Sequence, residues 1–184
     1  ELIHIGGDEC PKVRWEKCPR CQARIRQLGL RDKDGYTAEH YLQGYVTDRI
    51  GKYLAERGRR IIGWDEILEG QAPSDAIVMS WRGSAGGIKA AKLGHDVIMT
   101  PNSHFYFDYY QSPDADAEPF GIGGCVTIDK VYSFDPMADL TPGQQAHILG
   151  VQANLWTEYI ASDDHLEYML LPRLAALSEV QWCQ

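Results

Sequence analysis

Two adjacent carboxylates near the start of the chain are the leading candidates for chemistry. Asp8 and Glu9 close the segment His4-Ile5-Gly6-Gly7-Asp8-Glu9, in which a glycine turn follows a short apolar run. Neighbouring carboxylates repel each other, and partial burial would leave one ionised and the other able to donate a proton. Acid/base hydrolysis of a glycoside needs this division of labour. An Asp-Glu pair is also common on protein surfaces ahead of a helix, so the pair alone leaves both interpretations open.

Indoles and charged side chains follow the ends of other apolar runs. These are Trp64 with Asp65 and Glu66, Trp81 with Arg82, and Trp156 with Glu158. An indole packs well on the C–H face of a sugar, and a carboxylate accepts hydrogen bonds from neighbouring hydroxyls. Core packing is the usual role of tryptophan. Three of the five tryptophans follow predicted strands, however, which favours a binding site.

The elements that must position these residues alternate between strand and helix. Apolar runs of strand length cover residues 2–5, 60–64, 76–81, 97–100 and 148–152. Helical patterns cover residues 37–57, 85–93 and 166–180, with a kink or a fresh start expected at Pro172. A further helix start is predicted at Thr141, as a capping residue, with Pro142 in the first turn and Gln144 reaching back. Uniformly apolar strands separated by helices are typical of a parallel sheet, so the expected fold class is α/β.

A doubly wound sheet and a TIM (β/α)8 barrel both fit this order of elements. The polar and aromatic residues that follow the strands favour the barrel, because the loops after barrel strands converge on one mouth. No glycine-rich phosphate loop follows a strand, since Gly121-Ile122-Gly123-Gly124 lies in a long loop. Residues 101–140 are the longest irregular segment, which is typical of a functional loop.

Composition limits the class of protein. The 184 residues, 44% hydrophobic and 24% charged, suit one soluble domain. The formal charge is −8 with no basic stripe, so nucleic acid is not an expected partner. No apolar run is long enough to cross a bilayer, and we expect no membrane insertion. The first residues lack the pattern of a signal peptide, so either a signal was removed or the chain starts inside a larger protein.

Two groups of residues have types and spacing that could bind a metal. His4 with Asp8 and Glu9 could bind a metal, but a core histidine, or one that supports the site from behind, is the preferred interpretation. Cys18-Pro19-Arg20-Cys21 has zinc-ligand spacing with Cys10 upstream, but a second pair of ligands is missing. Cys10 could instead form a disulfide with Cys18 or Cys21, and the five cysteines leave at least one thiol outside any internal disulfide. We therefore expect no metal and no cofactor.

Several motifs, in order along the whole chain, resemble those of family-twenty glycoside hydrolases, the β-N-acetylhexosaminidases. The first is the His-x-Gly-Gly-Asp-Glu segment described above. The later ones are Gly63-Trp64-Asp65-Glu66, Ser80-Trp81-Arg82-Gly83, Tyr106-Phe107-Asp108, and Gly150-Val151-Gln152-Ala153-Asn154-Leu155-Trp156-Thr157-Glu158. Pro172-Arg173 and the segment from Ala176 to Trp182 resemble the final barrel helix of that family. Details of the first motif and the Cys18/Cys21 pair are similar to bacterial members.

This resemblance implies a substrate-assisted, retaining hydrolysis of terminal β-linked N-acetylglucosamine or N-acetylgalactosamine, through an oxazolinium intermediate. It implies that Glu9 is the general acid and base, and that Asp8 orients the 2-acetamido group. Tyr106 would hydrogen-bond the acetamido oxygen. The remaining implied sugar contacts are Trp64, Trp81 and Trp156 as walls, with Asp108 and Glu158 on hydroxyls. Asp108 ranks below Glu158 because Asp114 and Asp116 nearby suggest a solvated loop. Asp65 and Glu66 are interpreted as supporting residues.

The resemblance covers residues 1–184 and implies that they form the C-terminal part of a catalytic barrel. This part would contain about five βα units, which correspond to strands four to eight of the barrel. The first three strands, and the family's first-strand arginine, have no counterpart in the sequence. Five strands cannot close an eight-stranded barrel, so we expect self-association through open edges and weak or no turnover by the chain alone. For the parent protein, the resemblance implies a secreted or periplasmic location.

Three other functions are compatible with parts of this pattern. A sugar-binding fragment or pseudoenzyme would keep the aromatic pocket without catalysis. A metal-dependent barrel hydrolase would need further histidine ligands at strand ends, where His95, His104 and His147 do not fit well. A non-catalytic interaction domain would not need so many acids and indoles near one mouth.

Overall fold

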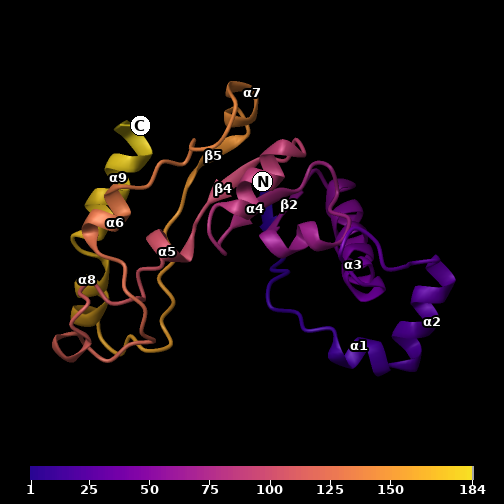
Figure 1. Cartoon of the computed structure of the whole chain (residues 1–184), viewed down its shortest axis with the longest axis horizontal. Helices are drawn as coiled ribbons and strands as arrows, with labels where there is room; N and C mark the ends of the chain where they lie inside the picture. The colour runs from indigo at the N-terminus through magenta and orange to yellow at the C-terminus, as the bar shows by residue number, and fades with distance from the viewer. Residues whose placement is uncertain (184) are drawn as a thin grey trace.

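A five-stranded parallel sheet forms the centre of the molecule (Figure 1). The computed structural model describes residues 1–183. Its strands are β1 (Leu2–His4), β2 (Arg60–Trp64), β3 (Ile77–Ser80), β4 (Val97–Met99) and β5 (Ile148–Val151). All five predicted strands are confirmed. Each strand pairs in parallel with the next in chain order, giving β1-β2-β3-β4-β5. A doubly wound sheet reverses its order part-way, whereas this sheet advances in one direction, as in part of a barrel.

Helices connect the strands and lie at both ends of the sheet. They are α1 (Val13–Lys17), α2 (Pro19–Leu28), α3 (Ala38–Ala55), η1 (Asp65–Glu69), α4 (Ala85–Lys92), α5 (Asn102–Phe105), η2 (Ala115–Ala117), α6 (Ile128–Tyr132), α7 (Pro142–Gln145), α8 (Asp163–Leu170) and α9 (Arg173–Cys183). In Figure 1, α1, α2 and α3 lie to one side of the sheet, and α6, α8 and α9 to the other.

The predicted helices are confirmed, with one subdivision and some omissions. The helix expected at residues 37–57 is α3, and the capping box at Thr141 and Gln144 is present at α7. The final helical pattern is divided at Leu171-Pro172 into α8 and α9. Helices α1 and α2 were not predicted, because only Ile25 of these two helices is buried and their apolar stripe is therefore weak.

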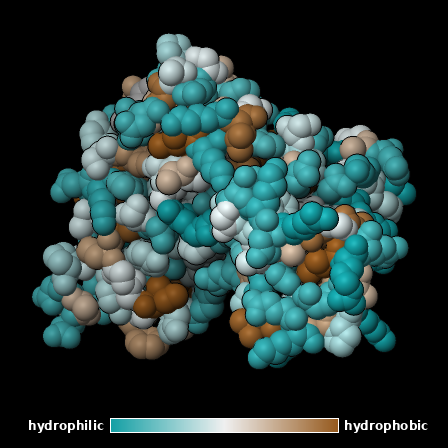
Figure 2. Space-filling model, turned by 45° about the vertical axis from the view of Figure 1, so that its right-hand side comes forward, coloured by the Kyte–Doolittle hydropathy of each residue, from teal (hydrophilic) through white to brown (hydrophobic). Residues whose placement is uncertain are grey.

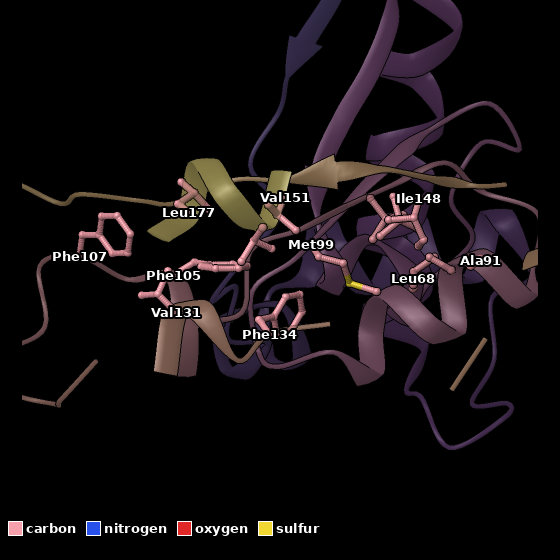
Figure 3. Packing of buried hydrophobic residues seen from close by; sticks show 14 of the residues in the cluster. Leu68, Ala91, Met99, Phe105, Phe107, Val131, Phe134, Ile148, Val151 and Leu177 are labelled. Atoms are coloured by element: carbon pink, nitrogen blue, oxygen red, sulfur yellow. The ribbon is translucent and has the colours of Figure 1, made fainter. Parts of the chain in front are cut away.

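Alternate residues of the central strands pack on opposite faces of the sheet. Ile61, Val78 and Met99 belong to the larger core cluster, which includes residues of α4, α6 and α9. Figure 3 shows the centre of this cluster, where Phe105, Val131 and Phe134 lie near Met99 and Val151. Ile62, Trp64, Ile77 and Met79 form a second cluster on the other face. In a barrel, this second face lines the interior, where layers of side chains meet.

The two outer strands are more exposed than the sequence predicted. Leu2 and Ile3 in β1 are 42% and 37% exposed, and Leu149 in β5 is 55% exposed. These side chains are therefore less covered than the uniformly apolar runs of a parallel sheet predict. Within residues 1–183, β1 pairs with β2 alone and β5 with β4 alone, so one edge of each strand has no neighbour. The face shown in Figure 2 is mostly hydrophilic, with hydrophobic residues in several separate patches. Among the described helices, none is both long and apolar enough to cross a membrane.

Candidate active site

The turn after β1 sets the position of Asp8 and Glu9. Gly6 and Gly7 have φ values of 70° and 105°, and Glu9 itself has a φ of 44°. Glycine adopts such angles freely, whereas Glu9 is held in a conformation that costs about 1–3 kcal/mol. The backbone N–H of Gly6 donates to His4 Nδ1 at 3.0 Å, and Gln43 Nε2 donates to the carbonyl of Gly7 at 2.8 Å. The Gly-Gly pair is therefore needed for the turn that presents both carboxylates at the end of the strand.

Replacing Gly7 by Ala should destabilise the protein by about 2–4 kcal/mol. An added Cβ would lie 2.7 Å from Ile67 Cγ2, and the φ of 105° disfavours any side chain. Gly29→Ala is the matched control, because Gly29 has a φ of 65° and nothing within 4 Å of an added Cβ. Denaturant unfolding measures both variants, and an equal loss in the two would show that the contact with Ile67 contributes nothing.

Asp8 and Glu9 are both exposed, and the expectation that they are partly buried was wrong. They follow β1, which has a neighbouring strand on one side only within the described residues. His4 is also exposed rather than part of the core. Its ring lies edge-on to the ring of Trp64, with the centroids 4.9 Å apart. His4 therefore packs against a predicted site residue, in agreement with the expectation that it supports the site from behind. Partial desolvation of the imidazole by its neighbours, although the residue as a whole is exposed, lowers the pKa of His4, and the charge of Asp8 opposes that shift.

Four aromatic rings lie close together at the ends of β2 to β5. Trp81 stacks on Tyr106 with ring centroids 6.2 Å apart and an angle of 16° between the planes. The ring centroid of Trp156 lies 6.1 Å from that of Trp64 and 6.2 Å from that of Tyr106, and its plane is inclined to both rings. These rings come from the last residue of β2 and from the segments that follow β3, β4 and β5, and they form the walls of one cavity. Such a surface suits the C–H groups of a sugar or an acetamido methyl group.

A strict alternation places Tyr106 and Asp108 at the cavity. Phe105 and Phe107 are fully buried in the core, so the residues next to them face the other way. Asn154 fixes this extended segment, because its N–H donates to Phe105 O at 2.8 Å and its carbonyl accepts from Phe107 N at 2.7 Å. Burial raises the pKa of Tyr106 to about 12, so its phenol keeps its proton and can donate a hydrogen bond.

Asp108 is the buried carboxylate of the cavity. It is 6% exposed, and its Oδ1 has no hydrogen-bond partner within the described chain. Burial raises the pKa of Asp108 to about 6, with a smaller contribution from the charge of Glu158. Glu158, by contrast, is exposed. The expectation that Asp108 lies in a solvated loop was therefore wrong, because Phe105 and Phe107 on either side of Tyr106 pack in the core and bury this segment. The ranking of the two acids as sugar ligands stays a prediction.

The folded-state pKa of Asp108 predicts a loss of stability as the pH rises. A carboxyl whose pKa is raised from 3.8 to about 6 on folding favours the folded state at low pH, and this contribution is lost as the pH passes through about 6. Asp108→Asn removes the titration, so the melting temperature of the variant relative to the unaltered protein should increase between about pH 4 and pH 7.5. Thermal unfolding across this range provides the check, and a constant difference would argue against the burial cost.

All eight predicted site residues line one cavity of about 320 Å³. They are Asp8, Glu9, Trp64, Trp81, Tyr106, Asp108, Trp156 and Glu158. Tyr109 and Ile122 also line it and were not predicted. Tyr109 adjoins the Tyr106-Phe107-Asp108 motif, which could have indicated it, whereas Ile122 lies in the long glycine-rich loop and has no distinguishing pattern. The volume suits one sugar residue with small substituents.

The other titratable clusters of the sequence analysis lie elsewhere. His95 and His147 precede β4 and β5, at the opposite end of the sheet from the cavity, and His95 Nδ1 contacts the carbonyl of Ala76. Residues 1–183 contain no group of three or more His, Cys, Asp or Glu side chains arranged to hold a metal ion. All five cysteines are free thiols, and Cys18 and Cys21 interact through their side chains at the start of α2.

Comparison with known proteins identifies the family. Residues 1–184 match the family described as "Glycosyl hydrolase family 20, catalytic domain". The chain belongs to this family. It is 48% identical to a β-hexosaminidase of Porphyromonas gingivalis over 182 residues, which cover 98% of this chain and 22% of that protein. It is 32% identical to a β-hexosaminidase of Vibrio furnissii over 180 residues, 96% of this chain and 28% of that protein.

Solved structures of family 20 share the fold. An exo-β-N-acetylglucosaminidase from Vibrio harveyi, in complex with N-acetylglucosamine, superposes with a TM-score of 0.84 at 30% identity, covering all of this chain and 28% of that one. An N-acetyl-β-hexosaminidase from Streptomyces plicatus superposes with a TM-score of 0.71 at 27% identity, covering 98% and 32%. This family 20 chain thus spans about a quarter to a third of the proteins it matches, and its open sheet corresponds to part of a barrel.

Proposed function

We propose that this family 20 chain carries most of the active site of a β-N-acetylhexosaminidase, which removes terminal N-acetylglucosamine or N-acetylgalactosamine from a glycan. The observation that carries the proposal is the single cavity lined by all eight residues that the family motifs imply. Two carboxylates at its mouth, four aromatic walls and a buried carboxylate with a free oxygen match the groups of an N-acetylhexosamine ring.

The proposed mechanism uses the acetamido group of the substrate as the nucleophile. Glu9 donates its proton to the glycosidic oxygen while the acetamido oxygen forms a bond to the anomeric carbon, and the leaving alcohol departs. Asp8 accepts a hydrogen bond from the acetamido N–H and stabilises the positive charge of the oxazolinium ion. Tyr106 donates its phenolic proton in a hydrogen bond to the acetamido oxygen. Glu9, now ionised, takes a proton from the water that attacks the anomeric carbon and opens the oxazolinium ring. The anomeric carbon is thus displaced twice, so the β configuration is retained.

Asp108 and Glu158 hold the far side of the sugar in this proposal. The free Oδ1 of Asp108 would accept a hydrogen bond from a ring hydroxyl, which removes the cost of an unpartnered buried oxygen. Trp64, Trp81 and Trp156 pack against the ring and the acetamido methyl group. The mouth of the cavity, where Asp8 and Glu9 are exposed, leaves room for the rest of the glycan.

Release of an aryl alcohol from an aryl N-acetyl-β-glucosaminide, compared with the plain aryl β-glucoside, tests the mechanism. We expect turnover that requires the acetamido group. The assay should use this chain alone and a chimaera in which it replaces the matching 182 residues of the Porphyromonas gingivalis β-hexosaminidase. Equal turnover of both substrates by the chimaera would exclude substrate assistance. A chimaera that binds N-acetylglucosamine but hydrolyses nothing would support the sugar-binding alternative.

The chain alone should turn over substrate weakly, because five strands leave the cavity open on the sides of β1 and β5. Light scattering tests the proposed self-association through these two edges, and a monomer at assay concentrations would contradict it. A secreted or periplasmic location of the parent protein is part of the proposal, and cell fractionation checks it.

A further inference from the structure

The wall formed by Trp81 is held from behind by a buried carboxylate. Trp81 Nε1 donates a hydrogen bond to Glu66 Oε2 at 2.9 Å. Glu66 is 8% exposed and belongs to η1, the short helix that directly follows β2. The hydrogen bond therefore joins the loop after β3 to the loop after β2, and it fixes the rotation of the indole.

The orientation of this indole decides what the cavity presents to a ligand. Trp81 stacks on Tyr106 with only 16° between the ring planes, so its ring lies parallel to a neighbouring wall. Its only polar atom, Nε1, is engaged by Glu66 and is not offered to the cavity. The Trp81 wall thus presents an apolar face, which suits a methyl group better than a hydroxyl.

A single guanidinium group compensates the charge of Glu66. Arg82 Nε lies 3.6 Å from Glu66 Oε1 and 3.3 Å from Asp65 Oδ1, and Arg82 Nη1 lies 2.7 Å from Glu69 Oε1. Three carboxylates thus share one arginine. Burial raises the pKa of Asp65 to about 7, opposed by Arg82 and reinforced by Glu66. Glu69 Oε2 also lies 3.8 Å from His40 Nε2, whereas the indole N–H of Trp81 donates to Glu66.

We propose that Glu66 is a positioning residue that orients the indole of Trp81, so that the cavity selects the acetamido methyl group. The identity of the ligand rests on the proposed function, whereas the orientation of the indole does not. Arg82 holds Glu66 in place, and Glu69 belongs to the same charge cluster without touching the indole. Glu66→Met removes the acceptor and keeps a similar volume, Glu66→Gln keeps an acceptor oxygen, and Glu69→Gln is the control within the cluster.

Hydrogen exchange at the indole N–H groups, measured by NMR on the ¹⁵N-labelled chain, tests the hydrogen bond. The protein has five tryptophans, and the signal missing from Trp81→Phe identifies Trp81. We expect exchange at Trp81 Nε1 to be about 10- to 100-fold faster in Glu66→Met, as for the loss of a bond to a charged group. Glu66→Gln should restore most of the protection, and Glu69→Gln should leave it unchanged.

Titration with N-acetylglucosamine on the same samples tests the role. We expect about 10-fold weaker binding by Glu66→Met, and affinity near that of the unaltered protein for Glu66→Gln. Unchanged exchange or unchanged affinity in Glu66→Met overturns the proposal, and so does an equal effect of Glu69→Gln. If Glu66→Met does not fold, Glu66→Gln decides. Its neutral acceptor should give exchange a few-fold faster, and no change would overturn the proposal.

An error in the proposed function would be distinguishable from an error in the role of Glu66. If the unaltered protein does not bind N-acetylglucosamine, the function is wrong as stated, while the exchange rates still report on the orientation of Trp81.

Discussion

Replacing Glu9 by Gln in the chimaera should lower kcat/KM for an aryl N-acetyl-β-glucosaminide by about 10²- to 10⁴-fold. The amide of Gln cannot donate a proton to the glycosidic oxygen and cannot take one from water. The structure supports this role through position, because Glu9 lines the same cavity as the aromatic walls and lies at the end of β1. Its left-handed backbone conformation shows that the fold holds this residue in place against a local cost.

The dependence of the rate on the leaving group distinguishes a residue that donates a proton from one that only binds the substrate. An aryl group with an acidic phenol needs little help from an acid, whereas a poor leaving group needs much, so the loss in Glu9→Gln should grow as the leaving alcohol becomes less acidic. Steady-state rates with a series of aryl substrates measure this. Glu16→Gln in α1, which is exposed and does not line the cavity, controls for removal of one charge. A uniform loss across the series would contradict the acid role of Glu9.

Replacing Arg173 by Met should destabilise the protein by about 3–5 kcal/mol, the largest effect on stability that we expect. The side chain is fully buried at the start of α9 and donates to four backbone carbonyls. Burial lowers the pKa of Arg173 to about 10, so it remains charged at neutral pH. Its removal leaves the carbonyls of Phe107, Tyr109, Val126 and Met169 without this donor, which is costly in a buried site.

The same substitution should loosen one wall of the cavity. Arg173 Nη2 contacts the carbonyl of Phe107 at 2.7 Å and Nη1 that of Tyr109 at 2.9 Å, on either side of Asp108. Arg173 thus ties the loop that carries Asp108 to the final helix. Arg173→Lys keeps the charge without the planar fork and should be intermediate.

Thermal unfolding and N-acetylglucosamine titration measure these two consequences. For a protein of this size, the expected loss corresponds to a decrease in melting temperature of about 10 °C. Arg14→Met, at an exposed position of α1, controls for removal of one positive charge. A decrease in melting temperature no larger than that of Arg14→Met would show that the four hydrogen bonds of Arg173 contribute no net stability.

The sequence by itself determined the five strands, the longer helices that follow them and the eight residues that meet in one cavity. Apolar runs such as Ile61-Ile62 and Ile77-Val78-Met79 form the strands because both of their faces are covered, and the run pattern reports this directly. Parallel strands carry their following loops to one edge, so Trp64, Trp81 and Trp156 could be assigned to one site without coordinates. Gly6-Gly7 likewise predicted a turn, which their positive φ values confirm.

Only the tertiary structure decided the environment of these residues. Asp108 is buried, and Glu158 exposed, because Phe105 and Phe107 anchor one segment in the core, and this depends on contacts with α6 and α9 that no local pattern reveals. The bond from Trp81 to Glu66 and the carbonyl contacts of Arg173 join segments 15 and up to 66 residues apart. Burial, the pKa values and the orientation of side chains follow from such long-range contacts, whereas periodicity and turn chemistry are local and can be read along the chain.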